Sequence, residues 1–138
     1  MKVVIIEDEE FAARRLERMI GEIDPGTQVV AKLESVGESV KWLKNNQQPD
    51  LIFMDIHLED NLSFAIFSNV AISCPIVFTT ATDEKSTILF RQKQLDYLLK
   101  PIVMDELKHV LSKYSLSQAD NRQIVDASFF TDITKRNN

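Results

Sequence analysis

Acidic, hydroxyl and basic side chains stand directly after four short apolar runs of the sequence. In chain order they are Glu7, Asp8, Asp55, Thr79, Thr80 and Lys100, and Pro101 follows the lysine. If the runs are neighbouring parallel strands, their carboxyl ends share one edge of a sheet, where functional groups gather. Three carboxylates held close together in a cleft repel one another strongly unless a cation joins them. The pattern therefore predicts a site for a hard, oxygen-seeking divalent ion.

Magnesium fits this predicted site, because Mg²⁺ binds one or two protein carboxylates, keeps several waters and accepts phosphate oxygens as further ligands. One carboxylate oxygen then stays free to attack phosphorus in line, while Lys100 and a hydroxyl neutralise charge on the transferred group. Asp55 is the best candidate for the nucleophile, since it stands alone after a central strand, whereas Glu7 and Asp8 are adjacent and can share the ion. The Lys100–Pro101 bond is a candidate for the cis geometry, which is almost confined to X-Pro. These residues describe a phosphoryl acceptor.

Each of these residues also has a purely structural interpretation. Glu7 and Asp8 could form a solvated acidic turn before a helix, and Asp55 could be an ordinary helix cap. Thr80 could satisfy backbone groups at a strand end, and Tyr97 could be a core aromatic in a terminal strand. The arrival of three acids and a lysine at one edge favours the chemical interpretation.

Five apolar runs of strand length alternate with segments of helical spacing. The expected strands are Val3–Ile6, Val29–Leu33, Leu51–Met54, Ile76–Phe78 and Tyr97–Leu99. The expected helices have apolar faces made of Phe11, Leu16, Met19, Ile20 and Ile23; of Val36, Val40 and Leu43; of Phe64, Phe67 and Val70 or Ala71; of Ile88, Leu89 and Gln92; and of Leu107, Val110, Leu111 and Tyr114. Apolar runs without alternation suit strands buried on both faces. Right-handed crossovers then give a doubly wound α/β domain with a parallel sheet.

Composition and charge exclude several classes of protein. The 138 residues allow one domain with a short extension, and 44% hydrophobic with 27% charged residues is typical of a globular chain. A net charge of −5 disfavours direct binding of nucleic acid or of an anionic membrane surface. A single cysteine, Cys74, and two histidines exclude an intrachain disulfide and a Cys/His zinc cluster. We expect a cytoplasmic protein.

Two stretches bear on domain organisation. The longest uncharged run, Asn61–Thr82, contains too many polar residues for a membrane span and reads as helix, turn and strand. After Ser115 the alternation stops and a polar stretch follows, in which the charges cancel. We therefore expect a domain over residues 1–115 and a polar tail or linker over residues 116–138.

Four ordered motifs resemble the receiver domain of response regulators in two-component signalling. They are IIEDE at 5–9, LIFMDIHL at 51–58, IVFTTA at 76–81 and DYLLKP at 96–101. The resemblance covers residues 1–115. The segments DIHL, FTTATDE and DYLLKP further resemble those of receivers that precede a LytTR-type DNA-binding domain. The implied fold is a flavodoxin-like (βα)5 three-layer sandwich with a parallel sheet in the order 2-1-3-4-5.

The resemblance assigns roles to the residues at the predicted edge. It implies that a histidine kinase phosphorylates Asp55, and that Glu7 and Asp8 bind Mg²⁺ together with Asp55 and the main-chain carbonyl of His57. Lys100 would hold the phosphoryl group. The implied activity is that of a switch and not of an enzyme.

The resemblance also implies how phosphorylation would be read out. Thr80 would hydrogen-bond the bound phosphate, for which the small Ala81 leaves room, and Tyr97 would swing inward. This movement would alter the surface formed by the fourth helix, the fifth strand and the fifth helix, through which the chain could form a homodimer. A phosphate adds about −1.5 to −2 charges, enough to bias a two-state loop. The output would be transcriptional, through a LytTR-type domain outside this chain.

Three departures and four alternatives accompany this interpretation. Asn61 stands where a glycine is common, which asparagine tolerates because it adopts left-handed geometry. The fourth helix carries polar residues 85–87, and the output half is missing, so the chain could be a stand-alone receiver or a pseudo-receiver that acts as an interaction module. An Asp-nucleophile phosphohydrolase is disfavoured because His57 occupies the place of its second acid. Flavodoxin-like cofactor binding is disfavoured because no Ser/Thr/Gly-rich phosphate loop follows the first strand.

Overall fold

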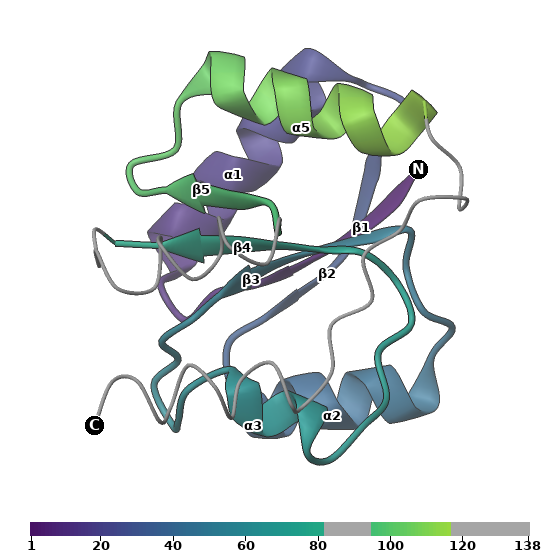
Figure 1. Ribbon diagram of the computed structural model, residues 1–138, viewed down its shortest axis with the longest axis vertical. Helices are drawn as coiled ribbons and strands as arrows, with labels where there is room; N and C mark the ends of the chain where they lie inside the picture. The colour runs from purple at the N-terminus through teal and green to yellow at the C-terminus, as the bar shows by residue number, and fades with distance from the viewer. Residues whose placement is uncertain (82–94, 117–138) are drawn as a thin grey trace.

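Five parallel strands form the central layer of the computed structural model, which describes residues 1–81 and 95–116 (Figure 1). The strands are β1 (Lys2–Ile6), β2 (Gln28–Leu33), β3 (Leu51–Asp55), β4 (Ile76–Thr80) and β5 (Tyr97–Leu99). Their order across the sheet is β2-β1-β3-β4-β5, which confirms the predicted order. Because every neighbouring pair is parallel, all the carboxyl ends lie on the same edge.

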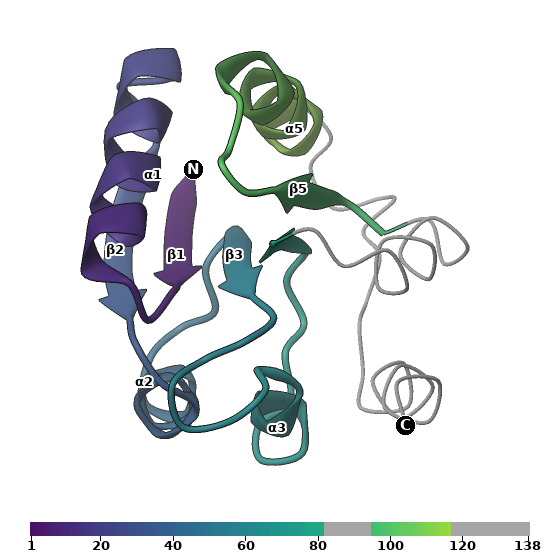
Figure 2. The same ribbon diagram turned by 90° about the vertical axis from the view of Figure 1, so that its left-hand side faces the viewer.

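Helices cover both faces of the sheet and complete three layers. Those described are α1 (Glu10–Ile23), α2 (Val36–Asn45), α3 (Phe64–Phe67) and α5 (Met104–Leu116). Figure 2 shows α1 and α5 on one side of the sheet and α2 and α3 on the other. The predicted helix around Ile88, residues 85–87 and the polar tail lie outside the described residues.

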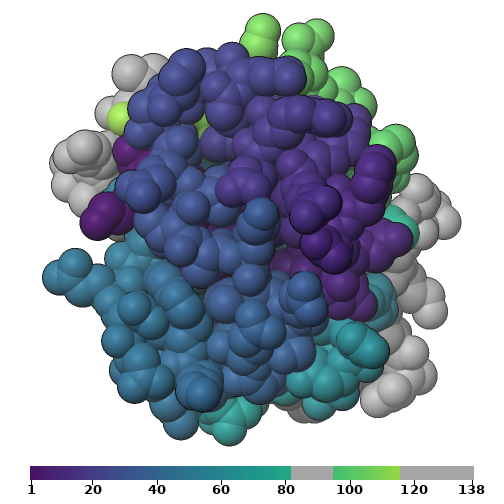
Figure 3. Space-filling model, turned by 180° about the vertical axis from the view of Figure 1, so that it is seen from behind, coloured from purple at the N-terminus to yellow at the C-terminus, as the bar shows by residue number. Residues whose placement is uncertain are grey.

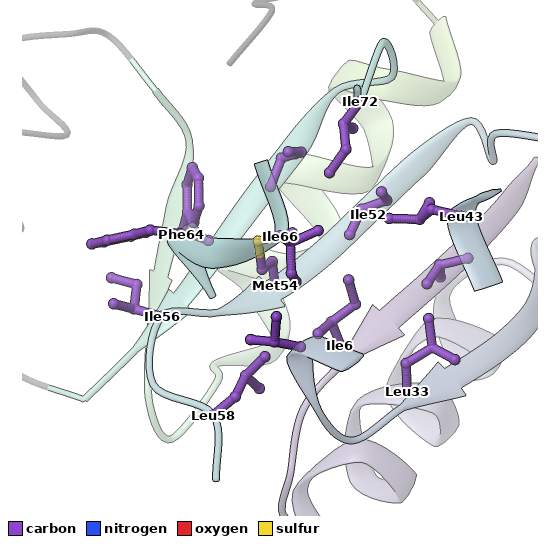
Figure 4. Close-up of a cluster of buried hydrophobic side chains, with 14 of the residues drawn as sticks. Ile6, Leu33, Leu43, Ile52, Met54, Ile56, Leu58, Phe64, Ile66 and Ile72 are labelled. Carbon is purple, nitrogen blue, oxygen red and sulfur yellow. The ribbon is translucent and has the colours of Figure 1, made fainter. Parts of the chain in front are cut away.

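The buried strands supply two hydrophobic clusters, one on each face of the sheet. In β3, Ile52 and Met54 belong to the cluster beneath α2 and α3 (Figure 4), whereas Leu51 and Phe53 belong to the cluster beneath α1 and α5. This two-sided burial explains why the apolar runs do not alternate with polar residues. Full burial of one large apolar side chain contributes about 1.5–3 kcal/mol to the stability of the fold. Packing on both faces thus fixes the sheet edge that carries the predicted site.

One predicted core residue is wrong. The apolar spacing predicts Phe11 on the buried face of α1, but its side chain is 79% exposed. Leu16 and Ile20 are buried, and successive helix residues turn by about 100°, so Phe11 lies about 140° around the helix from Leu16. Figure 3 shows the molecule from behind, with α1 in the upper half and α2 in the lower half.

The third helix is shorter than predicted. It ends at Phe67 and does not reach Val70. Ser68 and Asn69 follow, and the Asn69 side-chain amide donates to the main-chain oxygen of Ala65 at 2.8 Å. Such local side-chain bonds compete with the helical pattern, which explains the early end.

Candidate metal centre

The sheet register places the predicted site residues at one edge. Asp55 is the last residue of β3 and pairs with Thr79 of β4. The Glu7 amide, just after β1, donates to the Leu33 carbonyl at 2.9 Å, and the Lys100 amide, just after β5, donates to the Thr80 carbonyl at 2.8 Å. Backbone pairing between neighbouring strands therefore sets the positions of the acids and the lysine.

Three acids form a cluster suited to a cation. Glu7, Asp8 and Asp55 each offer one carboxylate oxygen, and these oxygens lie within 4.8 Å of one another. Glu7 and Asp55 are 5% and 7% exposed, while Asp8 is half-buried. Oxygen ligands about 2.1 Å from an octahedral Mg²⁺ lie up to about 4.2 Å apart, so small side-chain movements would let this donor set hold the ion. The all-oxygen donors suit magnesium better than a softer metal.

Lys100 supplies the positive charge within the described site. Its Nζ donates to Asp55 Oδ2 at 2.9 Å and also donates to Glu7 Oε1. The Lys100–Pro101 peptide bond is cis, as the sequence suggested. Lys100 is thus an internal counter-ion shared by a carboxylate from β1 and one from β3.

Burial and ion pairing change the pKa values of this pair. Burial raises the pKa of Glu7 to about 7, although the hydrogen bond from Lys100 acts in the opposite direction. Burial alone would lower the pKa of Lys100, but its hydrogen bonds to Glu7 and Asp55 together raise it. Lys100 therefore stays charged, and Glu7 gives up its proton only near neutral pH.

The predicted switch residues lie beside the acid cluster and not within it. The Thr80 hydroxyl is buried and donates to the main-chain oxygen of Ala81 at 2.8 Å, while Ala81 itself is exposed. Tyr97 is half-buried and packs against the cluster beneath α2 and α3. Pro101 is exposed.

The loop between β3 and α3 carries His57, whose main-chain carbonyl is a predicted metal ligand. His57 is exposed, and its amide donates to Asp55 Oδ1 at 3.3 Å. The base of the loop is closed by the Ser63 amide, which donates to the Ile56 carbonyl at 2.8 Å. The first loop residue is held by β4, because the Ile56 amide donates to the Thr79 carbonyl at 3.2 Å.

One residue of this loop, Asp60, makes structural contacts that no signal in the sequence indicates. Asp60 accepts hydrogen bonds from the amides of Val36 and Gly37 at 2.9 and 3.2 Å, and so ties the loop to the start of α2. These partners are 24 and 23 residues away, and no local spacing rule pairs residues at that separation. Only the folded arrangement reveals this contact.

A cavity of about 500 Å³ borders the site between α1 and the segment after β5. Glu7, Lys100 and Thr79 line it together with apolar residues such as Phe11 and Ile102. The buried Glu7 and the half-buried Lys100 therefore line this cavity as well as contacting each other.

The parallel sheet, the acidic edge and the opposed lysine define a receiver domain. The family model of the response regulator receiver domain matches residues 3–112, and the chain belongs to this family. Receiver domains of response regulators are signalling modules of two-component systems. The predicted fold and family are thereby confirmed.

Relatives and solved structures agree with this assignment. The sensory transduction protein LytT of Enterococcus faecalis is 32% identical over 118 residues, which are 83% of this chain and 48% of LytT. The positive alginate biosynthesis regulatory protein of Pseudomonas aeruginosa is 33% identical over 118 residues, 83% of this chain and 47% of that protein. The chain spans about half the length of these curated relatives. The response regulatory domain of protein mrkE from Klebsiella pneumoniae has a TM-score of 0.70 and 30% identity, covering 83% of this chain and 95% of that domain.

None of the helices in the described ranges, residues 1–81 and 95–116, combines the length and the apolar character that crossing a bilayer requires.

Proposed function

We propose that this chain is the phosphoacceptor module of a response regulator and that Asp55 is its phosphorylation site. The observation that carries the proposal is the position of Asp55 at the end of the central strand β3. There it accepts a hydrogen bond from Lys100, and one of its carboxylate oxygens lies within 4.8 Å of a carboxylate oxygen of Glu7 and of Asp8. A carboxylate in this place can act as a nucleophile toward phosphorus while neighbouring charges hold the transferred group.

The phosphodonor in this proposal is a phosphohistidine on a histidine kinase. An Asp55 carboxylate oxygen bonds to phosphorus as the phosphorus–nitrogen bond breaks, and the electron pair stays with the imidazole nitrogen, which takes a proton. Lys100 already contacts Asp55 Oδ2 and can move with its charge to the new phosphoryl oxygens. Glu7, Asp8, Asp55 and the main-chain carbonyl of His57 would hold Mg²⁺. When bound, Mg²⁺ supplies neutralisation of the charge that spreads over the equatorial oxygens.

The read-out in this proposal begins at Thr80. Its hydroxyl exchanges its bond to the Ala81 carbonyl for one to the phosphoryl group, and Tyr97 moves inward on the neighbouring strand. The affected surface comprises β5, α5 and the predicted fourth helix, and a homodimer through this surface is part of the proposal. Residues 1–115 form the receiver and residues 116–138 lead toward a LytTR-type output domain that controls transcription in the cytoplasm.

Phosphorylation with a small-molecule donor tests this proposal. The wild-type chain, incubated with acetyl phosphate and Mg²⁺, should gain one phosphoryl group in its intact mass, and Asp55→Asn should gain none. Asp50→Asn is the matched control, because Asp50 is exposed, lies just before the opposite end of β3 and should label like the wild type. Equal labelling of Asp55→Asn would contradict the assignment. No labelling of the wild type would favour an interaction module instead.

A further inference from the structure

The carboxylate of Asp60 binds the first turn of α2 from a different part of the chain. Oδ1 accepts from the Val36 amide at 2.9 Å and Oδ2 from the Gly37 amide at 3.2 Å, although the Asp60 side chain is exposed. Amides at a helix start have no partner within the helix, and a negative charge there is favourable. These bonds lower the pKa of Asp60, the Val36 bond most, so the carboxylate is ionised and both contacts persist at neutral pH.

Helix α2 also has a cap of its own. Ser35 is its N-cap residue, and the Ser35 hydroxyl oxygen accepts from the Glu38 amide at 3.1 Å. Ser35 therefore supplies the usual local cap. The contact from Asp60 is additional, and what distinguishes it is that it fixes the β3–α3 loop and not only the helix.

This contact links the β1 half of the acid cluster, Glu7 and Asp8, to the β3 half, Asp55, in addition to the direct pairing of β1 with β3 in the sheet. The segment before α2 holds the β1 half, because the Leu33 carbonyl accepts from the Glu7 amide at 2.9 Å. Asp60 holds the β3 half, because it lies on the loop that follows Asp55 and carries His57. Leu58 also anchors this loop in the core beneath α2 and α3, but residues 57 and 59–61 are exposed. Apart from Leu58, Asp60 is the loop residue whose side chain ties this exposed tip to the β2–α2 segment in the described structure.

We propose that Asp60 is a positioning residue of the metal site. It fixes the tip of the β3–α3 loop on the start of α2 and so sets the place of the His57 main chain relative to Glu7, Asp8 and Asp55. The inference rests on the proposed function, since it concerns how the same site binds Mg²⁺. Outer-shell partners of metal ligands typically change metal affinity by about 10–100-fold when removed, and we expect a value near the lower end for a residue that acts through a loop.

Four variants separate positioning from the other effects of the residue. Asp60→Ala removes both acceptors and the charge, whereas Asp60→Asn keeps one acceptor oxygen. Ser35→Ala removes a cap bond from the same helix without touching the loop. Glu59→Gln removes an equal charge from the neighbouring exposed position of the same loop. Loss of helix capping and loss of charge are therefore each represented by a control.

Calorimetric titration with Mg²⁺ is the decisive measurement. The dissociation constant should rise about tenfold for Asp60→Ala and by an intermediate factor for Asp60→Asn. It should stay within about twofold of wild type for Ser35→Ala and Glu59→Gln. Labelling by acetyl phosphate gives a second readout, in which Asp60→Ala should need more Mg²⁺ for its half-maximal rate but reach the wild-type rate at saturation.

Three results would overturn the inference. The first is an Asp60→Ala dissociation constant equal to that of wild type, which would leave the proposed phosphorylation of Asp55 intact. The second is an equal weakening by Asp60→Ala and Glu59→Gln, which would assign the effect to charge alone. The third is a wild-type chain that binds no Mg²⁺, which would remove the proposed function as well. If Asp60→Ala does not fold, the Mg²⁺ dissociation constants of Asp60→Asn and Glu59→Gln are compared instead. Equal dissociation constants for these two variants overturn the proposal.

Discussion

At Glu7, burial and ion pairing act in opposite directions, and burial has the larger effect. The side chain is 5% exposed and its pKa is raised to about 7 from an ordinary value of 4.5. The hydrogen bond from Lys100 to Glu7 stabilises the charged carboxylate and so offsets part of the effect of burial. One lysine thus pairs with two buried carboxylates, and its charge only partly offsets the free-energy cost of burying them.

This imbalance predicts a pH dependence of stability without metal. Below about pH 4.5, Glu7 is protonated in both the folded and the unfolded chain. As the pH rises to about 7, the unfolded chain loses this proton first, so the free energy of unfolding falls by up to about 3 kcal/mol. Urea unfolding in a chelator at pH 5 and pH 7.5 should show a larger fall for wild type than for Glu7→Gln. Identical falls in the two proteins would contradict the raised pKa.

The core of the site was predictable from single residues because a parallel sheet brings its carboxyl ends together. Glu7, Asp8 and Lys100 directly follow strands and Asp55 ends one, and the structure places them at one edge. The partner choice of Lys100, which bridges acids from two strands, depends on side-chain geometry that no spacing encodes. Asp60 was missed for the same reason.

Among the elements, α5 is fastened to the start of β5 by a polar contact. The Tyr114 hydroxyl donates to Asp96 Oδ2 at 2.5 Å, and Lys113 Nζ contacts the same oxygen at 2.8 Å. Burial and the nearby Asp96 carboxylate raise the pKa of Tyr114, so its hydroxyl remains a donor. Because Asp96 directly precedes Tyr97, this contact anchors α5 beside a residue of the proposed read-out.

Removing the tyrosine hydroxyl tests how much this anchor contributes. Tyr114→Phe keeps the ring but leaves Asp96 without that donor, and hydrogen bonds to charged groups contribute about 1.5–3 kcal/mol. We expect the free energy of unfolding to fall by about 1–2 kcal/mol, since Asp96 keeps its contact with Lys113. Lys113→Met, which removes an exposed ion pair, should cost less than about 1 kcal/mol. Chemical unfolding of both variants measures the difference, and a larger loss for Lys113→Met would contradict this ranking.

Most elements could be predicted from periodicity, and the errors have local causes. The strands were recognisable because burial on both faces demands continuous apolar runs, as in β3. Phe11 was misassigned because an apolar residue near a helix start can lie off the buried stripe. The end of α3 depends on the side chain of Asn69, which apolar spacing does not report.

At the scale of the whole molecule, the family match and the similarity to relatives have different extents. The receiver family model ends at residue 112, whereas LytT of Bacillus anthracis aligns at 27% identity with 97% of this chain and 55% of its own length. Similarity to this longer regulator thus extends beyond residue 112, where the match to the family model ends. This extent supports the proposal that residues 116–138 lead toward an output domain.

A shortened chain tests the proposed domain boundary. A protein of residues 1–116 keeps all of the described site and both described hydrophobic clusters. We expect it to unfold in one cooperative transition, as small single domains do, and to bind Mg²⁺ with the affinity of the full chain. A broad transition, or Mg²⁺ binding weaker by tenfold, would place essential contacts in the removed residues.

The sharing of β3 between two hydrophobic clusters limits how this strand can change in evolution. Adjacent residues of β3 enter opposite clusters, so one inserted or deleted residue would send every following side chain to the wrong face. The same shift would turn Asp55 away from Glu7 and Lys100. Exchange of one apolar residue for another leaves the alternation of side chains between the two faces unchanged. Descendants of this sequence are therefore free to vary the composition of β3 but not its length.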